Sequence, residues 1–136
     1  MIVLDKPPQA YSIAGVDRCL LFVYGQLQPG GHEPKTASHA WPDRVQGLLY
    51  DLGDYPAATN ISQSNCWFHG FVLDLDNAEL DDLDRFEAVS KSMYRRIRVT
   101  TEAGFNAWIY EYARSLPNDA VGPIERWVVP RRRAEG

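Results

Sequence analysis

One stretch of the chain carries a sustained helical pattern, and this limits the possible folds more than any other feature of the sequence. Residues 77 to 88 place apolar side chains at helical spacing. Asp76 before them is a favourable N-cap, and Glu79 three residues later predicts a capping box. A single well-formed helix, without regular alternation of strands and helices, argues for an α+β domain.

The other patterns in the chain are those of β-strands. Residues 19 to 24 are a continuous apolar run that ends at Gly25, which is typical of a strand buried on both faces. Gly70 lies within an alternating run and marks a bulge or a close approach of backbones. Further strand patterns, of which the last two predict a hairpin, cover residues 44–52, 67–75, 94–101 and 105–113. We therefore expect a mixed, mostly antiparallel sheet that curls into a partial barrel with one main helix.

The composition is that of one globular domain. Of the 136 residues, 45% are hydrophobic and 24% charged, which suits one core that needs no disulfide or metal. We place this domain at residues 18–128, after an irregular lead-in at 1–17 and before a basic tail at 129–136 that contains three consecutive arginines. Residues 33–40 predict one short helix before Pro42.

The charge balance and the apolar pattern exclude several classes of partner. The chain has 14 basic and 18 acidic residues and a net charge of -4, which disfavours nucleic acid as a partner. No apolar run approaches the roughly 20 residues that a membrane span requires, so no membrane partner is expected. The N-terminal residues lack the pattern of a secretory signal, which predicts a soluble, cytoplasmic protein.

The cysteines and histidines do not form a metal-binding or catalytic pattern. Cys19 and Cys66 lie far apart without a ligand at metal spacing, and each is expected to be a buried thiol. His32 and His39 lie in a loop-like stretch, whereas His69 shares an alternating face with aromatic residues and is interpreted as a hydrogen-bonded core histidine. We therefore expect no metal and no Ser–His–Asp triad.

Glu87 is the acidic residue that a solvated surface explains least well. At about 100° per residue, the helix buries Leu80, Leu83 and Phe86, and Glu87 falls inside that arc. Asp81, Asp82 and Asp84 fall on the outer flanks, where acids are ordinarily solvated. An inward carboxylate at the C-terminal end of a helix meets both desolvation and the negative end of the helix dipole, which suits a general base. The alternative is an ion pair with one of the nearby residues Arg95, Arg96 and Arg98.

The second candidate site is the loop that follows the first long strand, Tyr24-Gly25-Gln26-Leu27-Gln28-Pro29-Gly30. A glycine at this place lets successive backbone N–H groups turn toward one point and form a nest for an anion. The alternative is a plain tight turn. The loop lacks the lysine of a phosphate-binding loop and the dinucleotide fingerprint, so a nucleotide is not expected.

Together these features resemble the γ-glutamylcyclotransferase-like superfamily, especially its small γ-glutamylamine cyclotransferase-type members. The loop Tyr24-Gly25-Gln26-Leu27 is similar to the Tyr-Gly-Ser/Thr-Leu loop of that family. Leu83-Asp84-Arg85-Phe86-Glu87, followed by Tyr94-Arg95-Arg96, is similar to its Leu-Asp-x-x-Glu helix end and Tyr-x-Arg strand start. The resemblance spans roughly residues 20 to 113, and intermediate landmarks also agree, namely Gly47 to Leu52, Tyr55-Pro56-Ala57 and His69-Gly70.

The resemblance implies an enzyme whose small-molecule substrate carries a γ-glutamyl group. The α-amine of that group attacks its own side-chain carbonyl, and the products are 5-oxoproline and a free amine or amino acid. Glu87 would move the proton, first as base and then as acid. The backbone amides of Gly25, Gln26 and Leu27 would hold a carboxylate or the developing oxyanion. Tyr24, Tyr94 and Tyr110 would border the pocket, with packing in the core as the alternative role of Tyr94 and Tyr110. No cofactor is implied.

Two departures from the family pattern keep a second interpretation open. Gln26 stands where the family has Ser or Thr, and Ala88 stands where relatives often have Gly. A non-catalytic member that binds a small molecule or a protein would have its pocket filled by Gln26, or its acid paired with an arginine. An enzyme would have Glu87 facing the loop of residues 24–27.

Overall fold

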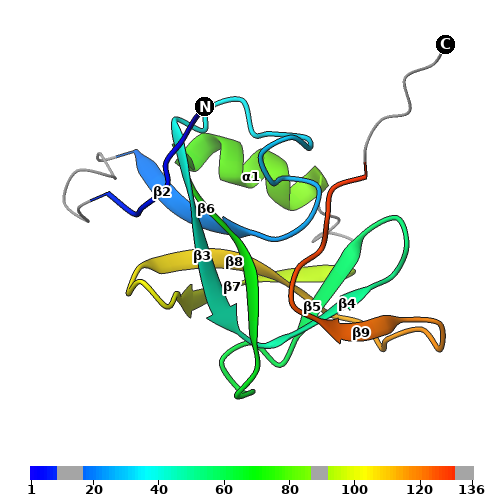
Figure 1. Cartoon of the computed structure of the whole chain (residues 1–136). Helices are drawn as coiled ribbons and strands as arrows, with labels where there is room; N and C mark the ends of the chain where they lie inside the picture. The colour runs from blue at the N-terminus through cyan, green and yellow to red at the C-terminus, as the bar shows by residue number, and fades with distance from the viewer. Residues whose placement is uncertain (9–16, 87–91, 131–136) are drawn as a thin grey trace, which may run out of the picture.

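A computed structural model describes residues 1–8, 17–86 and 92–130 of the chain. Nine strands and one helix lie in these ranges (Figure 1). In chain order they are β1 (Ile2–Val3), β2 (Arg18–Val23), β3 (His39–Gln46), β4 (Leu48–Asp51), β5 (Pro56–Thr59), β6 (Trp67–Asp76), α1 (Asn77–Phe86), β7 (Tyr94–Thr100), β8 (Asn106–Tyr112) and β9 (Val121–Ile124).

The strands form two sheets, and the prediction of an α+β domain with a mixed, mostly antiparallel sheet is confirmed. The larger sheet has six strands in the order β1-β3-β6-β2-β8-β7, with parallel pairing only between β1 and β3 and between β2 and β8. The smaller sheet has the antiparallel order β5-β4-β9. Figure 1 shows α1 on one side of the larger sheet and the smaller sheet beside its lower strands.

The curling of the sheet does not go as far as a barrel, because the larger sheet does not close. Its end strands, β1 and β7, remain separate edges. The single strand expected at 44–52 is instead divided at Gly47, where β3 stops pairing with β6 and β4 begins to pair with β5 and β9. A Cβ at Gly47 would lie 2.9 Å from the Phe68 ring, so this bend requires glycine. The chain therefore leaves the larger sheet at Gly47 and begins the smaller one, whereas a barrel would require the larger sheet to continue past this point.

The core lies on both faces of β2, as its continuous apolar run predicted. Phe22 belongs to a cluster with Trp41 and Phe68 on one face. Leu21 and Val23 belong to the other cluster, into which α1 inserts Leu80. Each such fully buried side chain contributes about 1.5–3 kcal/mol to folding. Gly70 on β6 allows the expected close approach, because a Cβ there would lie 2.3 Å from the Val23 carbonyl oxygen.

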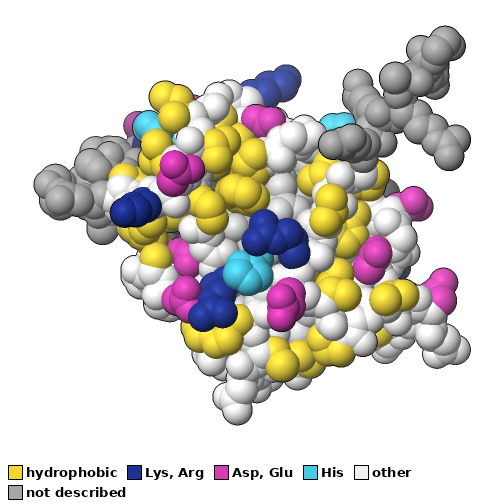
Figure 2. All heavy atoms as spheres, viewed as in Figure 1, with side chains coloured by type: hydrophobic (Ala, Val, Ile, Leu, Met, Phe, Trp, Pro, Cys, Tyr) yellow, Lys and Arg dark blue, Asp and Glu magenta, His cyan; other side chains and the backbone are white. Residues whose placement is uncertain are grey.

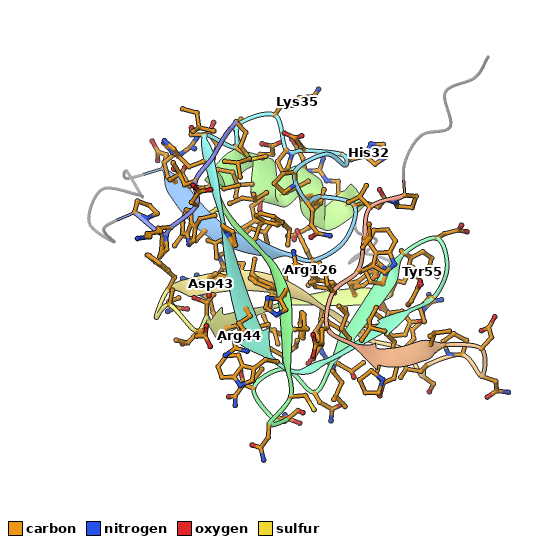
Figure 3. The ribbon with its side chains drawn as sticks, in the orientation of Figure 1. His32, Lys35, Asp43, Arg44, Tyr55 and Arg126 are labelled. Carbon is orange, nitrogen blue, oxygen red and sulfur yellow. The ribbon has the colours of Figure 1, made fainter. Side chains whose placement is uncertain are left out.

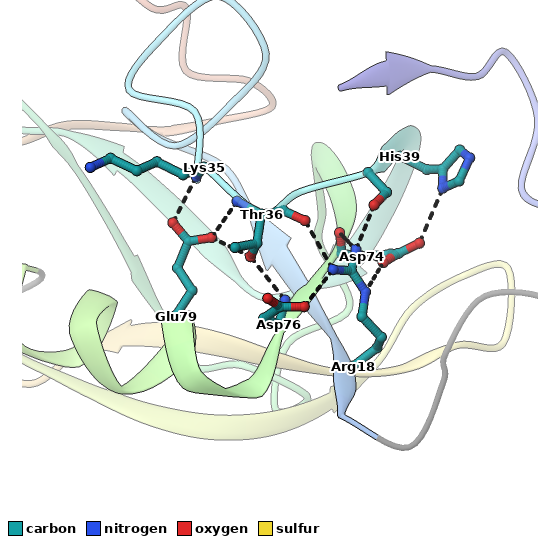
Figure 4. A network of polar contacts seen from close by, with 8 residues as sticks. Arg18, Lys35, Thr36, His39, Asp74, Asp76 and Glu79 are labelled. Carbon is teal, nitrogen blue, oxygen red and sulfur yellow. Dashed lines mark hydrogen bonds and ion pairs between the residues drawn. The ribbon is translucent and has the colours of Figure 1, made fainter.

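The first turn of α1 is stabilised differently from the predicted capping box. The Glu79 carboxylate accepts hydrogen bonds from the backbone N–H groups of Lys35 and Thr36, both at 2.7 Å, and from the Thr36 hydroxyl (Figure 4). The Asp76 N–H donates to Thr36 Oγ1 at 3.0 Å. The short helix expected at 33–40 does not form, because residues 35 and 36 make only a turn and β3 begins at His39.

A buried ion pair joins the ends of β2, β3 and β6. Asp74 is 4% exposed and accepts a hydrogen bond from Arg18 Nε at 2.8 Å and a contact from His39 Nδ1 at 3.1 Å (Figure 4). Arg18 also donates to Asp76 Oδ1 at 2.7 Å. Although burial opposes it, pairing with Asp74 and Asp76 raises the pKa of Arg18 above its ordinary value. The buried carboxylate of Asp74 is therefore neutralised within the fold.

Segments that were expected to be irregular contribute to the sheets and the core. In the predicted lead-in, Ile2 and Val3 pair with β3. Near the predicted tail, the segment 125–130 is mostly exposed, but its Trp127 is 4% exposed and donates from Nε1 to Asp51 Oδ1 at 3.1 Å. The predicted arginine cluster at 131–133 lies outside the described residues.

Two sequence-based expectations about burial also need correction. Cys66, expected to be buried, is exposed, whereas Cys19 is partly buried. Burial raises the pKa of the Cys19 thiol. His69, expected in the core, is only partly buried because it occupies the face of β6 that carries Trp67 and Phe71, which are partly exposed as well.

Candidate active site

Residues from four separate segments line one small cavity of about 50 Å³. It contains all six residues that the sequence predicted as substrate-binding: Tyr24, Gly25, Gln26, Leu27, Tyr94 and Tyr110. Val23, Tyr55 and Pro56 complete the lining. The cavity is far smaller than the several hundred Å³ typical of sites for drug-sized ligands, so it suits the compact polar end of a small molecule.

The side chain of Gln28 holds the loop that forms one wall of this cavity. Gln28 is 4% exposed, and its Nε2 donates to the carbonyl oxygens of Tyr24 at 2.9 Å, Gly25 at 3.1 Å and Trp127 at 3.0 Å. The Gln28 backbone N–H donates to the Gly25 carbonyl oxygen at 3.1 Å. The sequence pattern indicates no such role for Gln28, because a glutamine beside Pro and Gly is typical of an exposed turn.

Three consecutive backbone N–H groups in this loop are available to a ligand. Within residues 1–8, 17–86 and 92–130, no protein acceptor takes the N–H of Gly25, Gln26 or Leu27. Leu27 is 6% exposed, so its N–H lies in a largely desolvated environment. Such donors can bind a carboxylate or a developing oxyanion, as the predicted nest requires.

Gly25 is required for a different reason from the one the loop pattern suggested. Its φ is outside the left-handed region, which Gly30 in the same loop does adopt at +91°. A Cβ at Gly25 would instead lie 2.9 Å from Pro56 Cγ and 3.1 Å from Pro56 Cδ. The glycine therefore lets the loop pack against the start of β5.

Three tyrosines of the cavity wall use their hydroxyl hydrogens within the protein. The Tyr24 hydroxyl donates to the carbonyl oxygen of Tyr110. The Tyr94 hydroxyl donates to the carbonyl oxygen of Pro56 at 2.9 Å. The Tyr110 hydroxyl donates to Asp84 Oδ1 at 2.7 Å. Each ring is at most 7% exposed, so these hydrogen bonds fix the wall in place.

Asp84 was predicted to be a solvated surface acid, and that prediction is wrong. Its side chain is 24% exposed and pairs with Arg96 Nε at 2.9 Å, in addition to accepting from Tyr110. Asp81 and Asp82 are exposed, as expected. The position of Asp84 four residues after the buried Leu80 is the signal that would have placed it at the edge of the buried face.

The predicted base, Glu87, and the neighbouring Ala88 lie outside the described residues. The last described residue of α1 is Phe86. Asp84, three residues before Glu87 in the sequence, contacts the cavity wall through Tyr110. The end of the described part of α1 therefore lies beside the cavity.

Gln26 lines both this cavity and a larger groove of about 980 Å³. Its Nε2 lies 3.4 Å from the Asp54 carbonyl oxygen, a weak hydrogen bond. The groove runs between the loop of residues 26–32 and the segment 126–130. Figure 3 labels His32 and Arg126 on these two walls and Tyr55 beyond the C-terminal segment.

Neither a metal site nor a membrane span is found among the described residues. In the ranges that the structure describes, His, Cys, Asp and Glu side chains form no group of three or more that suits a metal ion. No helix in those ranges has both the length and the apolar character to cross a bilayer.

On the face in Figure 2, acidic and basic side chains stand close together, and Arg44, labelled in Figure 3, pairs with Glu102.

Comparisons with known proteins agree with this architecture. The model of the family described as gamma-glutamyl cyclotransferase, AIG2-like, matches residues 21–129. The crystal structure of an AIG2-like protein from Mus musculus is 20% identical, with a TM-score of 0.62 over 74% of this chain and 81% of that chain. The solution structure of protein ytfP from Escherichia coli is 31% identical, with a TM-score of 0.52 over 75% and 88% of the two chains.

A structure described as gamma-glutamyl cyclotransferase is 18% identical, with a TM-score of 0.51 over 71% of this chain and 67% of that chain. The sequence matches none of the curated proteins. The structural likenesses confirm the fold that the resemblance implied.

Proposed function

Because the chain belongs to the AIG2-like gamma-glutamyl cyclotransferase family, we propose that it cyclises the γ-glutamyl group of a small molecule to 5-oxoproline. The α-amine nitrogen attacks the γ-carbonyl carbon, and the new C–N bond closes a five-membered ring. The C–N bond to the leaving group then breaks, and one proton passes from the attacking nitrogen to the leaving nitrogen. The reaction neither consumes water nor needs a redox partner.

The observation that carries this proposal is the cavity beside the loop of residues 24–27. Gly25, Gln26 and Leu27, whose N–H groups have no acceptor among the described residues, line this cavity together with tyrosines, and this supports the proposal. These donors would bind the carboxylate of the substrate or the oxyanion that forms at the γ-carbonyl, and one such donor is worth about 3 kcal/mol to a transition state. Because ring closure is intramolecular, holding a reactive conformer supplies much of the remaining acceleration.

Glu87 is the proposed proton carrier. Its place in the sequence, directly after the described end of α1, supports this role. A carboxylate at that place would take the proton of the α-amine and return it to the leaving nitrogen. The leaving group itself would extend past Gln26 into the larger groove, which has room for an amine or an amino acid.

The test is a panel of γ-glutamyl amides and γ-glutamyl dipeptides, assayed for release of 5-oxoproline by the wild type and by Glu87→Gln. Glutamine is nearly isosteric with glutamate but cannot accept the proton, so turnover should fall about 10²- to 10⁴-fold while the fold is retained. Asp81→Asn, which changes an exposed acid on the same helix, should leave the rate unchanged.

Two outcomes would contradict parts of the proposal. Equal 5-oxoproline release by the wild type and Glu87→Gln would remove Glu87 from the mechanism. Binding of γ-glutamyl compounds without release of 5-oxoproline from any of them would favour a non-catalytic binding protein of the same family.

A further inference from the structure

Among the end strands of the two described sheets, β7 is the one that is not protected against pairing with another strand. β1 has only two residues, β5 begins with Pro56, and β9 contains Pro123 and pairs in an irregular register. β7 has seven residues, contains no proline or glycine, and pairs with β8 in an unbroken register. As an end strand of the larger sheet, it offers a long and regular edge.

The hydrogen bonds of the β7–β8 hairpin determine which backbone groups point outward. The Ala113 N–H donates to the Met93 carbonyl oxygen at 3.0 Å, and the Thr101 N–H donates to the Phe105 carbonyl oxygen at 2.9 Å. Because hydrogen-bonded and non-hydrogen-bonded pairs alternate in an antiparallel ladder, the odd-numbered residues of β7 bond to β8. The even-numbered residues direct their N–H and carbonyl groups away from β8.

The outward backbone groups of Arg96, Arg98 and Thr100 have no partner within residues 1–8, 17–86 and 92–130. The edge ends at the tip of the hairpin, where the Glu102 N–H donates to the Arg44 carbonyl oxygen at 2.8 Å. An extended segment that lies along this edge would pair with its outward donors and acceptors. In binding of this kind the backbones supply the affinity, and the side chains decide which partner is accepted.

The side chains of this edge are basic. β7 carries three arginines and no acidic residue. Arg95 and Arg96 pair with carboxylates of the protein at 2.8 and 2.9 Å. Arg98 is exposed and lies over the Trp108 ring, 4.2 Å from its centroid, with no carboxylate partner among the described residues. The aromatic ring therefore positions the Arg98 guanidinium, and its charge is left for a partner.

We propose that the free edge of β7 binds an extended acidic segment of a partner protein, which pairs antiparallel to β7 with a carboxylate side chain directly opposite Arg98. Two residues that exchange both hydrogen bonds across such a ladder have their side chains on the same face, about 5 Å apart. The neighbours of the acid then lie beside Ile97, which is partly buried, and Val99, which is 3% exposed, so apolar side chains suit them. This inference does not depend on the proposed function.

The charge of the edge also excludes other strands. Pairing of two β7 strands from two copies of the chain would bring their arginines together, and like charges on facing strands destabilise the pair. Charged side chains on an edge strand thus refuse uncharged and like-charged strands, and they select a strand of opposite charge.

The test is an NMR titration of the isotope-labelled, full-length protein with the peptide acetyl-Ser-Thr-Val-Glu-Val-Thr-Ser-amide. The peptide should protect from solvent exchange the amide hydrogens of the even-numbered residues from Arg96 to Thr100. The odd-numbered residues of β7 already bond to β8 and should gain no protection. A peptide with lysine in place of glutamate should bind about fivefold more weakly or worse.

Matched variants separate the local charge and the backbone pairing from general effects. Arg98→Glu should favour the lysine peptide, whereas Arg85→Glu, the same change of charge at an exposed position of α1, should keep the preference for glutamate. Methylation of the glutamate nitrogen of the peptide removes the hydrogen that the Arg98 carbonyl oxygen accepts, so it should abolish binding. Methylation of the nitrogen of the following valine, which points to solvent, should not.

Each of the following results would overturn the inference. No peptide binds at millimolar concentration, the glutamate and lysine peptides bind equally, the two methylated peptides bind equally, or the protection appears outside β7. An equal loss of preference in Arg85→Glu and Arg98→Glu would assign the effect to the net charge. The same protection in the protein without peptide, rising with protein concentration, would assign the edge to a second copy of the chain.

Discussion

Replacing Gln28 by methionine removes the hydrogen bonds that join the cavity loop to the C-terminal segment and keeps the volume of the side chain. The Nε2 atom has two hydrogens and lies within 3.1 Å of three carbonyl oxygens, so it makes two full bonds or shares them among three. A buried polar group left without its partner costs about 1–3 kcal/mol. Two such losses, partly relieved by relaxation, predict a decrease of about 3 kcal/mol in the free energy of unfolding.

For a chain of 136 residues this decrease corresponds to a fall in Tm of about 10 °C. Thermal unfolding followed by circular dichroism would measure it, with Gln63→Met at an exposed position as the control. Because the loop carries the N–H groups of the cavity, KM for a γ-glutamyl substrate should rise in the same variant. A Tm within 2 °C of the control would refute the assignment of Gln28 as the anchor of the loop.

Three further predictions concern single positions. Gly25→Ala places a Cβ against Pro56, so it should lower the free energy of unfolding by about 1–3 kcal/mol and slow the release of 5-oxoproline. An unchanged Tm and rate would show that the structure accommodates the added Cβ without loss of stability. Gln26→Ser should raise kcat/KM for substrates with larger leaving groups, because it opens the cavity toward the groove. Gln26→Ala should weaken substrate binding by about 1 kcal/mol. Unchanged kinetics in both variants would mean that the side chain of Gln26 does not contact the substrate. Iodoacetamide at pH 8 should alkylate the exposed Cys66 before Cys19. The Cys19 thiol stays protonated to higher pH because burial raises its pKa. Equal rates of labelling at the two cysteines, measured by mass spectrometry, would contradict this prediction.

The strands and the helix that depend on local pattern were predicted well. The apolar run of β2 and the alternation of β6, β7 and β8 show in the sequence because their side chains meet the core with a regular period. Strands β5 and β9 were missed because Pro56 and Pro123 are residues that ordinarily mark turns. Both strands lie at the edges of the smaller sheet, where proline is tolerated.

The errors in the candidate site come from contacts between residues far apart in the chain. Asp84 seemed solvated because a helical wheel contains only its own helix, whereas Tyr110 and Arg96 come from the β7–β8 hairpin. In the same way, Glu79 matched a capping box, but its carboxylate bonds to Lys35 and Thr36 across the fold. No local pattern specifies partners of this kind, since tertiary contacts decide among several locally acceptable hydrogen bonds.

The bond from Gln28 to the Trp127 carbonyl also sets a time at which the cavity can be completed during protein synthesis. It joins residues 99 positions apart. At roughly 5–20 residues per second, translation of that interval takes about 5–20 s. During this time the loop has been synthesised but the Trp127 carbonyl has not, so the N–H groups of residues 25–27 are not yet fixed in position by that bond. We expect ligand binding to begin only after Trp127 has left the ribosome.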